Sequence, residues 1–190
     1  MDFPNLPITY IPNFVPDPKK AFTSLWNELD WIRHDKVPRR EYYCNDFPDP
    51  YTYGASDFAR TYMPQPYHAE IVAMRWDLER LVSSRFEVTF LNGYEGNRDQ
   101  LGWHSDDSES MDDARPIGII SLGAEREIWF APQNDKSNVT KLKLGSGSLC
   151  IMHPGMQDTH YHRIPKAGYE CGPRISLTMR GYVRNEGNDK

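Results

Sequence analysis

The feature that most constrains the fold of this sequence is a change of hydrophobic period near residue 86. Upstream, two segments place apolar residues three and four positions apart, as amphipathic helices do. From Phe86 onward, Phe86, Val88 and Phe90 alternate with other residues, which predicts a strand. Gly and Pro separate many of the apolar segments that follow. We therefore predict short strands over 86–91, 117–122, 127–130, 139–144, 148–152, 158–162 and 174–183.

Two helices are predicted ahead of these strands. Asp17-Pro18 is a typical helix start, with Asp at the N-cap and Pro in the first turn. A second helix is predicted over 70–83, and residues 1–16 predict an extended lead-in strand. Apolar residues at helical spacing support the two helices, namely Phe22, Leu25, Trp26 and Leu29 in the first and Ile71, Met74, Leu78, Leu81 and Val82 in the second.

Two helices followed by many short strands predict an α+β chain that is mainly β. We expect a double-stranded β-helix (jelly-roll) core with the two N-terminal helices packed outside it. The 190 residues are most simply one domain. Within it, 1–85 is expected to hold the helices, 86–183 the jelly-roll core and 184–190 a flexible tail.

Composition narrows the class of protein. A net charge of -5 argues against a strongly basic nucleic-acid clamp, although a local basic patch remains compatible with it. The three cysteines lack C-x-x-C spacing, which favours a reducing compartment over a disulfide framework or a zinc knuckle. No signal-peptide pattern or membrane-length apolar run is present, so a cytoplasmic or nuclear protein is expected, without a membrane partner.

His104 and Asp106 form the first candidate metal-binding pair. On an extended strand, residues two apart point to the same face, so an imidazole and a carboxylate can converge. A second histidine would complete the two-His-one-carboxylate triad of non-haem Fe(II) oxygenases. His160 and His162 share a strand face and are equally suitable, and His153 is a weaker candidate. The ordinary alternative is a solvated polar loop.

The segment 174–180 places two arginines on one strand face. Arg174, Ser176, Thr178 and Arg180 alternate with apolar residues. Facing outward, the arginines would simply be solvated, whereas facing inward they would need anions as partners. A dicarboxylate could pair with both arginines, because each guanidinium offers a bidentate fork.

Two further segments have both an ordinary and a functional interpretation. Asn92-Gly93 is typical of a hairpin turn, but the adjacent Tyr94 is suited to binding an anionic ligand. In 33–58, prolines indicate irregular structure, and basic residues beside tyrosines suit a stacked base, although a surface loop with partly buried tyrosines explains them equally. The residues concerned are Lys36, Arg39, Arg40, Tyr51 and Tyr53.

Taken together, the motifs from about residue 90 to 180 resemble the AlkB family of Fe(II)- and 2-oxoglutarate-dependent dioxygenases. Their order and spacing are more specific than any single motif. They are Asn92-x-Tyr94, Gly102-x-His104-x-Asp106-Asp107, Ile120-Ser121-Leu122-Gly123-Ala124, the stretch 144–149, Tyr161-His162-Arg163-Ile164-Pro165, and Pro173-Arg174 through Arg180.

The resemblance implies a role for each matching residue. His104, Asp106 and His162 would bind iron, with His162 preferred because it precedes Arg-Ile-Pro. Arg174 and Tyr94 would hold the distal carboxylate of 2-oxoglutarate, and Arg180 and Asn92 would lie at its chelating end. The segment 51–54, with Tyr51 and Tyr53, would line a pocket for the damaged base, within a nucleotide-recognition loop of 1–85.

This sequence departs from the family pattern at two positions. Ser176 stands where the family usually has Asn, so its contact with the co-substrate is expected to be weaker. Ser108 follows the double Asp where relatives acting on duplex DNA often have Glu, and Glu109 comes one place later. Base reading near Asp107 is therefore expected to differ from that of those relatives.

The resemblance implies oxidative demethylation of 1-methyladenine- or 3-methylcytosine-type bases in DNA or RNA, with O2 consumed and formaldehyde released. The expected partner is a single-stranded or easily opened nucleic acid, bound by a monomer through a patch around Arg39 and Arg40. Two alternatives are a dioxygenase of this fold that acts on a protein or small molecule, and a non-catalytic jelly-roll binding module.

Overall fold

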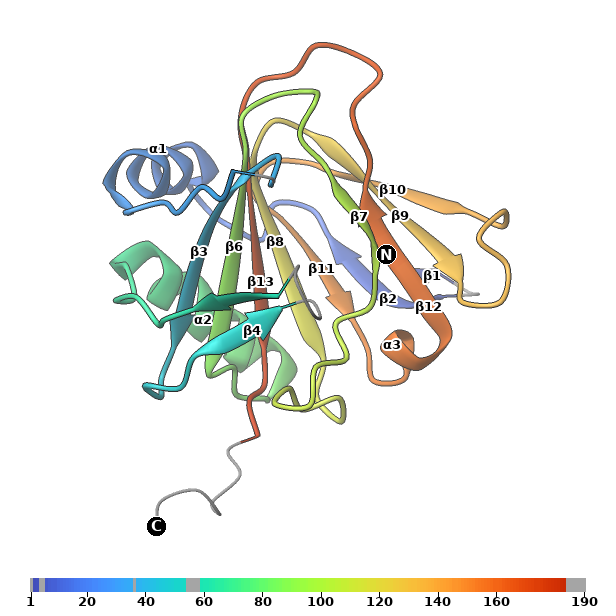
Figure 1. The fold of residues 1–190 in the computed structure, drawn as a ribbon, viewed down its shortest axis with the longest axis horizontal. Coiled ribbons are helices and arrows are strands. Elements are labelled where there is room, and N and C mark those ends of the chain that lie inside the picture. Colours follow the sequence, from blue (N-terminus) through green and yellow to red (C-terminus); the bar gives the residue numbers. More distant parts are fainter. Residues whose placement is uncertain (1, 4–5, 36, 54–58, 184–190) are drawn as a thin grey trace.

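The computed structural model describes residues 2–3, 6–35, 37–53 and 59–183 (Figure 1). Lys36, residue 54 and the predicted tail 184–190 lie outside these ranges. No helix within them has the length and apolar character needed to cross a membrane.

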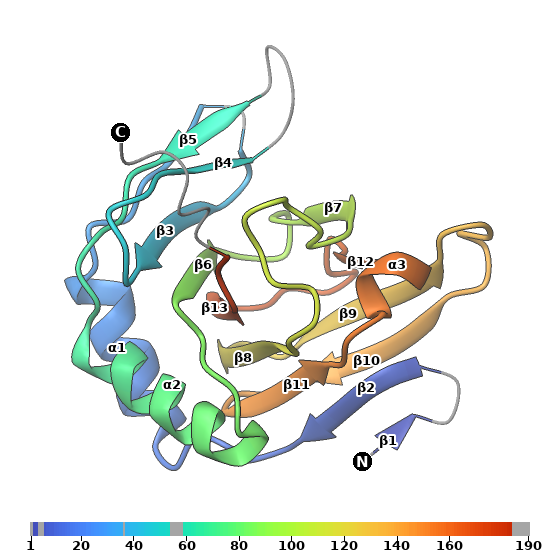
Figure 2. The same ribbon diagram turned by 90° about the horizontal axis from the view of Figure 1, so that it is seen from below.

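Two antiparallel sheets face each other and form the predicted jelly roll (Figures 1 and 2). The larger sheet has the order β1 (Asp2–Phe3), β2 (Leu6–Ile11), β11 (Ser148–Met152), β8 (Ile117–Gly123), β13 (Arg174–Arg180), β6 (Val88–Tyr94) and β3 (Arg40–Asn45). The smaller has the order β10 (Thr140–Leu144), β9 (Arg126–Pro132), β12 (His160–Ile164) and β7 (Leu101–His104). A separate hairpin pairs β4 (Tyr51–Tyr53) with β5 (Arg60–Tyr62).

Both predicted helices are present and pack outside the larger sheet (Figure 2). The first, α1 (Pro18–Glu28), begins where Asp17 accepts a hydrogen bond from the Lys20 backbone N–H. The second, α2 (Ala69–Val82), lies so close to β8 that a Cβ on Gly118 would overlap the Leu78 side chain. A glycine in β8 therefore allows the helix to approach the sheet.

The buried apolar side chains form three clusters. One fills the space between the helices and the larger sheet, and a second lies between the two sheets. The third is mainly aromatic and joins the hairpin to β3 and β6 through Tyr43, Tyr51, Tyr62 and Phe90. The pocket described below lies between the second and third clusters, because side chains from both line its wall.

The expectation of irregular structure over 33–58 was wrong in part. β3 pairs along its whole length with β6, and five of its six residues are buried. Pro38 precedes this strand and Pro48 follows it, so neither interrupts its hydrogen bonds. Pairing with a buried neighbour thus overrides a local sequence that has many polar and proline residues.

Several other element bounds also differ from the prediction. Asn92-Gly93 is not a turn but part of β6, where Gly93 pairs with both Ile175 and Arg40. Residues 158–159 belong to the short helix α3 (Met156–Thr159), so the strand begins only at His160. The last strand ends at Arg180 rather than residue 183, and β7 was not predicted.

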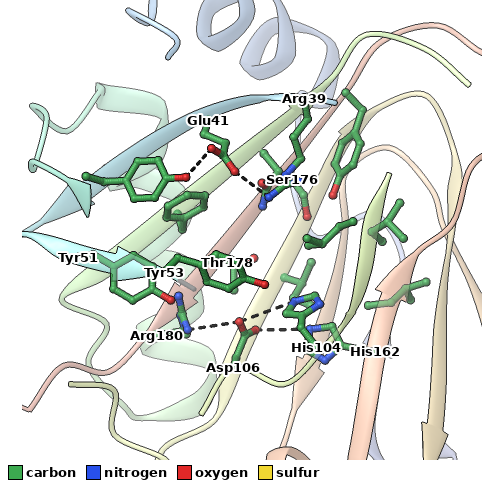
Figure 3. Close-up of a pocket in the computed structure, with 18 residues that line it drawn as sticks. Arg39, Glu41, Tyr51, Tyr53, His104, Asp106, His162, Ser176, Thr178 and Arg180 are labelled. Carbon is green, nitrogen blue, oxygen red and sulfur yellow. Dashed lines mark hydrogen bonds and ion pairs between the residues drawn. The ribbon is translucent and has the colours of Figure 1, made fainter. Parts of the chain in front are cut away.

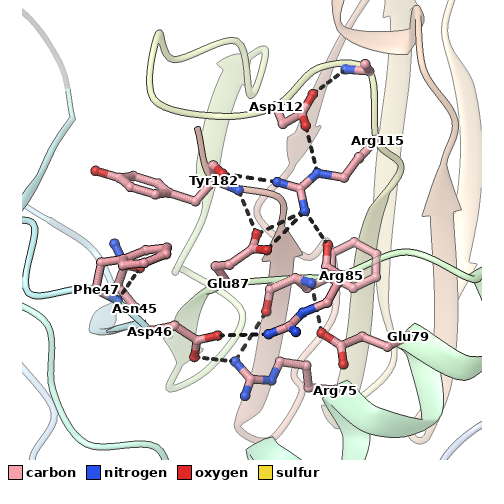
Figure 4. Close-up of polar contacts among 12 residues, drawn as sticks. Asn45, Asp46, Phe47, Arg75, Glu79, Arg85, Glu87, Asp112, Arg115 and Tyr182 are labelled. Atoms are coloured by element: carbon pink, nitrogen blue, oxygen red, sulfur yellow. Dashed lines mark hydrogen bonds and ion pairs between the residues drawn. The ribbon is translucent and has the colours of Figure 1, made fainter. Parts of the chain in front are cut away.

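A polar network fixes the chain just beyond β13 (Figure 4). Arg115 donates from Nη2 to the Tyr182 carbonyl at 3.1 Å, and its Nη1 lies 3.0 Å from the Glu87 carboxylate. Glu87 also accepts the Tyr182 backbone N–H, and Asp112 accepts from Arg115 Nε at 2.8 Å. One guanidinium thus joins the chain before β6, the segment before β8 and the end of β13.

We expect Arg115→Met to lower the free energy of unfolding by roughly 1–3 kcal/mol, because Glu87 and the Tyr182 carbonyl lose a charged donor. Burial acts to raise the pKa of Glu87, but its hydrogen bonds to Arg115 and Tyr182 hold it below the ordinary value. The part of the loss that depends on the Glu87 charge should therefore be full above the ordinary Glu pKa and fade as pH falls through the lowered one, whereas the part from the Tyr182 carbonyl remains.

Urea unfolding of the Arg115→Met variant at several pH values measures this effect. Arg80→Met is the matched control, since the Arg80 side chain is 81% exposed and its one ion pair with a described residue is to Asp77, one turn away. That control should change stability by less than about 0.5 kcal/mol. Equal losses in the two variants would mean that the network does not hold the end of β13.

Candidate metal centre

Two histidines and one aspartate meet at the end of β7 (Figure 3). His104 is the last residue of β7 and lies opposite His162 of β12 in the strand register. Asp106 follows two residues later, with Oδ1 3.9 Å from His104 Nε2 and Oδ2 3.5 Å from His162 Nε2. Their candidate ligand atoms all lie within 4.8 Å of one another, which a single metal ion can bridge.

The structure distinguishes the three candidate histidines. His162 is 4% exposed, and its ring centroid lies 4.2 Å from that of His104. His160, at the start of β12, instead places Nδ1 2.9 Å from Thr159 Oγ1, and His153 contacts Thr9. Of these three, only His162 belongs to the His-Asp-His group.

The charges at the centre favour metal binding. Burial lowers the pKa of His104 to about 4, so the ring is neutral at pH 7. Its Nδ1 lies 2.9 Å from the Gly102 carbonyl, which only accepts, so Nδ1 carries the proton and Nε2 is free to bind a metal. Burial acts to raise the pKa of Asp106, but the charge of Arg180 and contacts with both histidines hold it well below its usual range.

Asp106 is held from two sides. Arg180 Nη1 lies 3.3 Å from Asp106 Oδ1. The Asp106 backbone N–H donates to Gln157 Oε1 at 2.8 Å. Gln157 is a buried residue of α3. The short helix that the sequence did not predict therefore fixes the backbone of Asp106, whose carboxylate pairs with both histidines.

A pocket opens from this centre between the sheets and reaches the β4–β5 hairpin (Figure 3). Its wall is aromatic near the hairpin, polar near β3 and β6, and aliphatic near β8, β9 and β12. Lining residues include Tyr51, Tyr53, Tyr62, Phe90, Arg39, Glu41, Asn92, Tyr94, Ile119, Ile128, Ile164, Ser176, Thr178 and Arg180.

Next to the pocket lies a fully buried cation with unused donors. Arg174 pairs with Tyr94 in the β13–β6 register and is 0% exposed. Its Nη2 donates to Ser121 Oγ at 2.8 Å and to Ser176 Oγ at 3.4 Å. Its Nε and Nη1, and the Tyr94 hydroxyl, have no hydrogen-bond partner among the described residues.

Burial lowers the pKa of Arg174 to about 10, so the guanidinium still carries its charge at neutral pH. A buried cation without a counter-ion is costly, and a carboxylate would supply both the charge and the acceptors that are missing. Arg174, Tyr94 and Ser176 therefore fit one carboxylate of a small ligand. The strand-face pattern of Arg174 and Arg180 predicted a dicarboxylate, and its binding by these residues stays a prediction.

Arg39 is not the surface residue that the predicted basic patch required. It is 6% exposed, and its Nε donates to Asn92 Oδ1 at 2.6 Å. Its Nη2 pairs with Glu41 Oε1 at 2.7 Å, and Tyr62 donates to the other Glu41 oxygen. Sequence reasoning missed Glu41, because the Arg39-x-Glu41 alternation is informative only once β3 is known to be a strand.

Arg40 points to the opposite side of β3 from the pocket. Its guanidinium pairs with Glu95 at 2.8 Å and lies 4.9 Å from the Trp26 ring centroid. Arg39 and Arg40 therefore do not form one patch, since consecutive strand residues face opposite sides. Their predicted contacts with a nucleic acid stay predictions.

Tyr51 connects the hairpin to the metal centre. Its ring lies 5.4 Å from the Arg180 guanidinium, and its hydroxyl contacts Ser108 Oγ at 3.1 Å. Ser108, the position where the sequence departs from the family pattern, thus contacts the hairpin. Asp107 is exposed and shares with Tyr53 a groove formed by residues 50–53, 105 and 107–110. Their substrate roles stay predictions.

One further buried residue near the site was missed by sequence reasoning. Arg126 is 1% exposed and donates to the carbonyls of Gly96, Asp99 and Pro165. Its guanidinium also lies 5.6 Å from the Tyr94 ring. It fixes the loop after β6. The predicted strand 127–130 began one residue after Arg126, so sequence reasoning did not include it.

A jelly roll with a two-His-one-carboxylate centre beside an unpaired buried cation defines the class of non-haem iron oxygenases. A sequence model described as the 2OG-Fe(II) oxygenase superfamily matches residues 8–180. The chain therefore belongs to this superfamily and, within it, to the AlkB family.

Two curated relatives and one solved structure illustrate the similarity. Alpha-ketoglutarate-dependent dioxygenase alkB homolog 3 of Bos taurus is 31% identical over 82% of this chain and 56% of its own length. DNA oxidative demethylase ALKBH2 of Mus musculus is 27% identical over 76% of this chain and 62% of its own length. The chain thus spans 56–62% of these relatives.

The solved structure titled "The structure of OsALKBH1" has a TM-score of 0.68 and covers 95% of this chain and 99% of its own. At 14% sequence identity this likeness shows the fold alone.

We expect His162→Ala to lose divalent metal binding and His160→Ala to keep it, since only His162 lies with His104 and Asp106. Titration calorimetry with Mn(II) as an air-stable probe measures this directly, with thermal unfolding as a check on folding. Retained affinity in His162→Ala, or loss in His160→Ala, would place the metal elsewhere.

Proposed function

We propose that this chain is an Fe(II)- and 2-oxoglutarate-dependent dioxygenase that removes methyl groups from N-alkylated bases of DNA or RNA and releases formaldehyde. The observation that carries the proposal is the His-Asp-His centre beside the unpaired Arg174 and Tyr94, in a pocket that extends to an aromatic hairpin. The relative named DNA oxidative demethylase supports the substrate class.

His104, Asp106 and His162 would hold Fe(II), and Arg174 with Tyr94 would hold the distal carboxylate of 2-oxoglutarate. When bound, these groups and O2 supply the oxidising chemistry. Arg180 balances the charge of Asp106 and keeps it ionised as a ligand. The Gly102 carbonyl keeps the His104 proton on Nδ1, away from the metal side.

The other end of the pocket suits a flat base. Tyr51, Tyr53, Tyr62 and Phe90 offer aromatic surfaces, and the Arg39–Glu41 pair places a donor and an acceptor in the same wall. A base inside a duplex cannot reach the centre and must be flipped out. A methyl group that blocks base pairing lowers that cost, so we propose methylated single strands or easily opened duplexes as substrates.

We also propose that the chain works as a monomer in the cytoplasm, or in the nucleus if it is eukaryotic. Its cysteines, Cys44, Cys150 and Cys171, are all unpaired, which suits a reducing compartment. In this proposal residues 1–85 supply substrate recognition and 86–183 supply the chemistry.

The decisive measurement is formaldehyde release in the presence of Fe(II), 2-oxoglutarate and oxygen. We expect turnover of oligonucleotides that contain 1-methyladenine or 3-methylcytosine, faster in single strands than in duplexes, and none after Asp106→Asn. Turnover confined to methylated peptides or free small molecules would leave the dioxygenase chemistry and exclude the nucleic-acid substrate.

Arg174→Lys should weaken 2-oxoglutarate binding by about ten- to a hundredfold, which corresponds to losing roughly 1.5–3 kcal/mol of charge-assisted hydrogen bonding. A lysine keeps the charge but not the bidentate fork. Calorimetric titration of the Mn(II)-loaded protein reports the co-substrate affinity apart from turnover, and Arg80→Lys serves as control. Unchanged affinity in Arg174→Lys would remove this residue from the co-substrate site.

A further inference from the structure

A row of alternating rings and cations crosses the outer face of the smaller sheet. This row, which we call the outer row, consists of Trp103 of β7, Arg163 of β12, Trp129 of β9 and Lys141 of β10. The Arg163 guanidinium lies 5.4 Å from the Trp103 ring and 5.2 Å from the Trp129 ring. Lys141 Nζ lies 4.3 Å from the Trp129 ring, so the row crosses every strand of this sheet.

The row lies on the opposite side of the sheet from the pocket. Its sequence neighbours His104, His162 and Ile128 face the pocket, and adjacent strand residues point to opposite faces. Trp103 and Trp129 belong to none of the three apolar clusters. Packing of the core therefore does not account for two tryptophans on this face.

The cations of the row have no acidic partner. Within the described part of the chain, neither Arg163 nor Lys141 has a carboxylate within ion-pair distance, and Arg163 Nε is buried without a hydrogen-bond partner. Lys143, on the same face of β10, instead pairs with Glu125 at 3.7 Å. In a chain of net charge -5, Arg163 and Lys141 thus have no ion-pair partner among the described residues, and the nearest acidic group shown on this face, Glu127, instead accepts the Trp129 indole N–H at 2.7 Å.

We propose that the outer row binds a single-stranded segment of nucleic acid that flanks the base held in the pocket. This inference rests on the proposed function and adds a second contact surface to it. Cations that track a phosphate backbone, beside rings that can stack on bases, are the combination that single-strand binding uses. The chemistry of the row thus complements both parts of a nucleotide.

The position of the row supports this assignment. β7 is an edge strand, with Leu101 and His104 on the pocket side and Trp103 on the outer side. A strand that leaves the pocket can therefore pass round this edge onto the row. From β7 to β10 the row spans about 14 Å, at ~4.8 Å per strand spacing. That length accommodates a few nucleotides.

An acidic peptide is the competing ligand class. Its carboxylates would use Arg163 and Lys141 but would leave the two indole rings without a function. Nucleic acid uses both, so we favour it, and a polyglutamate peptide becomes an arm of the test.

The test compares a long and a short ligand by fluorescence anisotropy. The long one is a single strand of about 20 nucleotides carrying 3-methylcytosine, which exceeds the ~4–16 nucleotides covered by one binding groove. The short one is a trinucleotide with the same base. We expect the double variant Lys141→Gln/Arg163→Gln to bind the long strand about tenfold or more weakly and the trinucleotide unchanged.

The matched control is Lys143→Gln, which removes a charge from the same face of the same strand without touching a ring. It should leave both affinities unchanged. The salt dependence of long-strand binding should fall by about 1.4 in the double variant, at ~0.7 per lost phosphate contact in single strands. Trp129→Leu should also weaken long-strand binding but leave its salt dependence nearly unchanged, because a stacking ring is lost and both cations remain.

Equal binding of the long strand by the wild type and the double variant would overturn the proposal. So would polyglutamate binding that the double variant weakens as much as it weakens long-strand binding. Circular dichroism confirms that each variant is folded. Formaldehyde release from the trinucleotide by the wild type tests the proposed function separately, because that ligand is too short to reach the row.

Discussion

The antiparallel pairing of β13 with β6 and β8 is the contact on which the pocket depends. It sets Arg174 opposite Tyr94 and Ser176 opposite Asn92, and it turns Arg180 toward Asp106. Because side chains alternate along a strand, a slip of one residue would turn both arginines toward the helices and bring Ile175 into the ligand site. The apolar side of β13, packed under α1, therefore determines where the polar side lies.

Buried charge organises the rest of the site. Asp106 has Arg180 as its partner and Glu41 has Arg39, whereas Arg174 keeps donors for which no described residue offers an acceptor. The donors of Arg174 therefore suit an anionic ligand beside the pocket. Such a site gains affinity for an anion because the cost of burying the cation has already been met during folding.

Much of this arrangement was predictable from sequence where one face of an element is buried. Periodicity predicted both helices, with the Asp17-Pro18 start signal for the first, and it predicted the alternation from Arg174 to Arg180. Strand parity could not separate His160 from His162, since both share one face, and only the register with His104 does so. β3 and the Arg39–Glu41 pair escaped prediction because their geometry comes from pairing with a distant strand.

The β4–β5 hairpin carries the aromatic wall of the pocket, yet its strands pair only with each other among the described strands. It attaches to the jelly roll largely through rings, such as Tyr51 beside Tyr43 and Tyr62 beside Phe90. The ladder hydrogen bonds that align the metal-binding residues therefore do not pass through it. Substitutions in the hairpin can accordingly change the shape of the aromatic wall without disturbing the strand pairing that aligns the metal-binding residues.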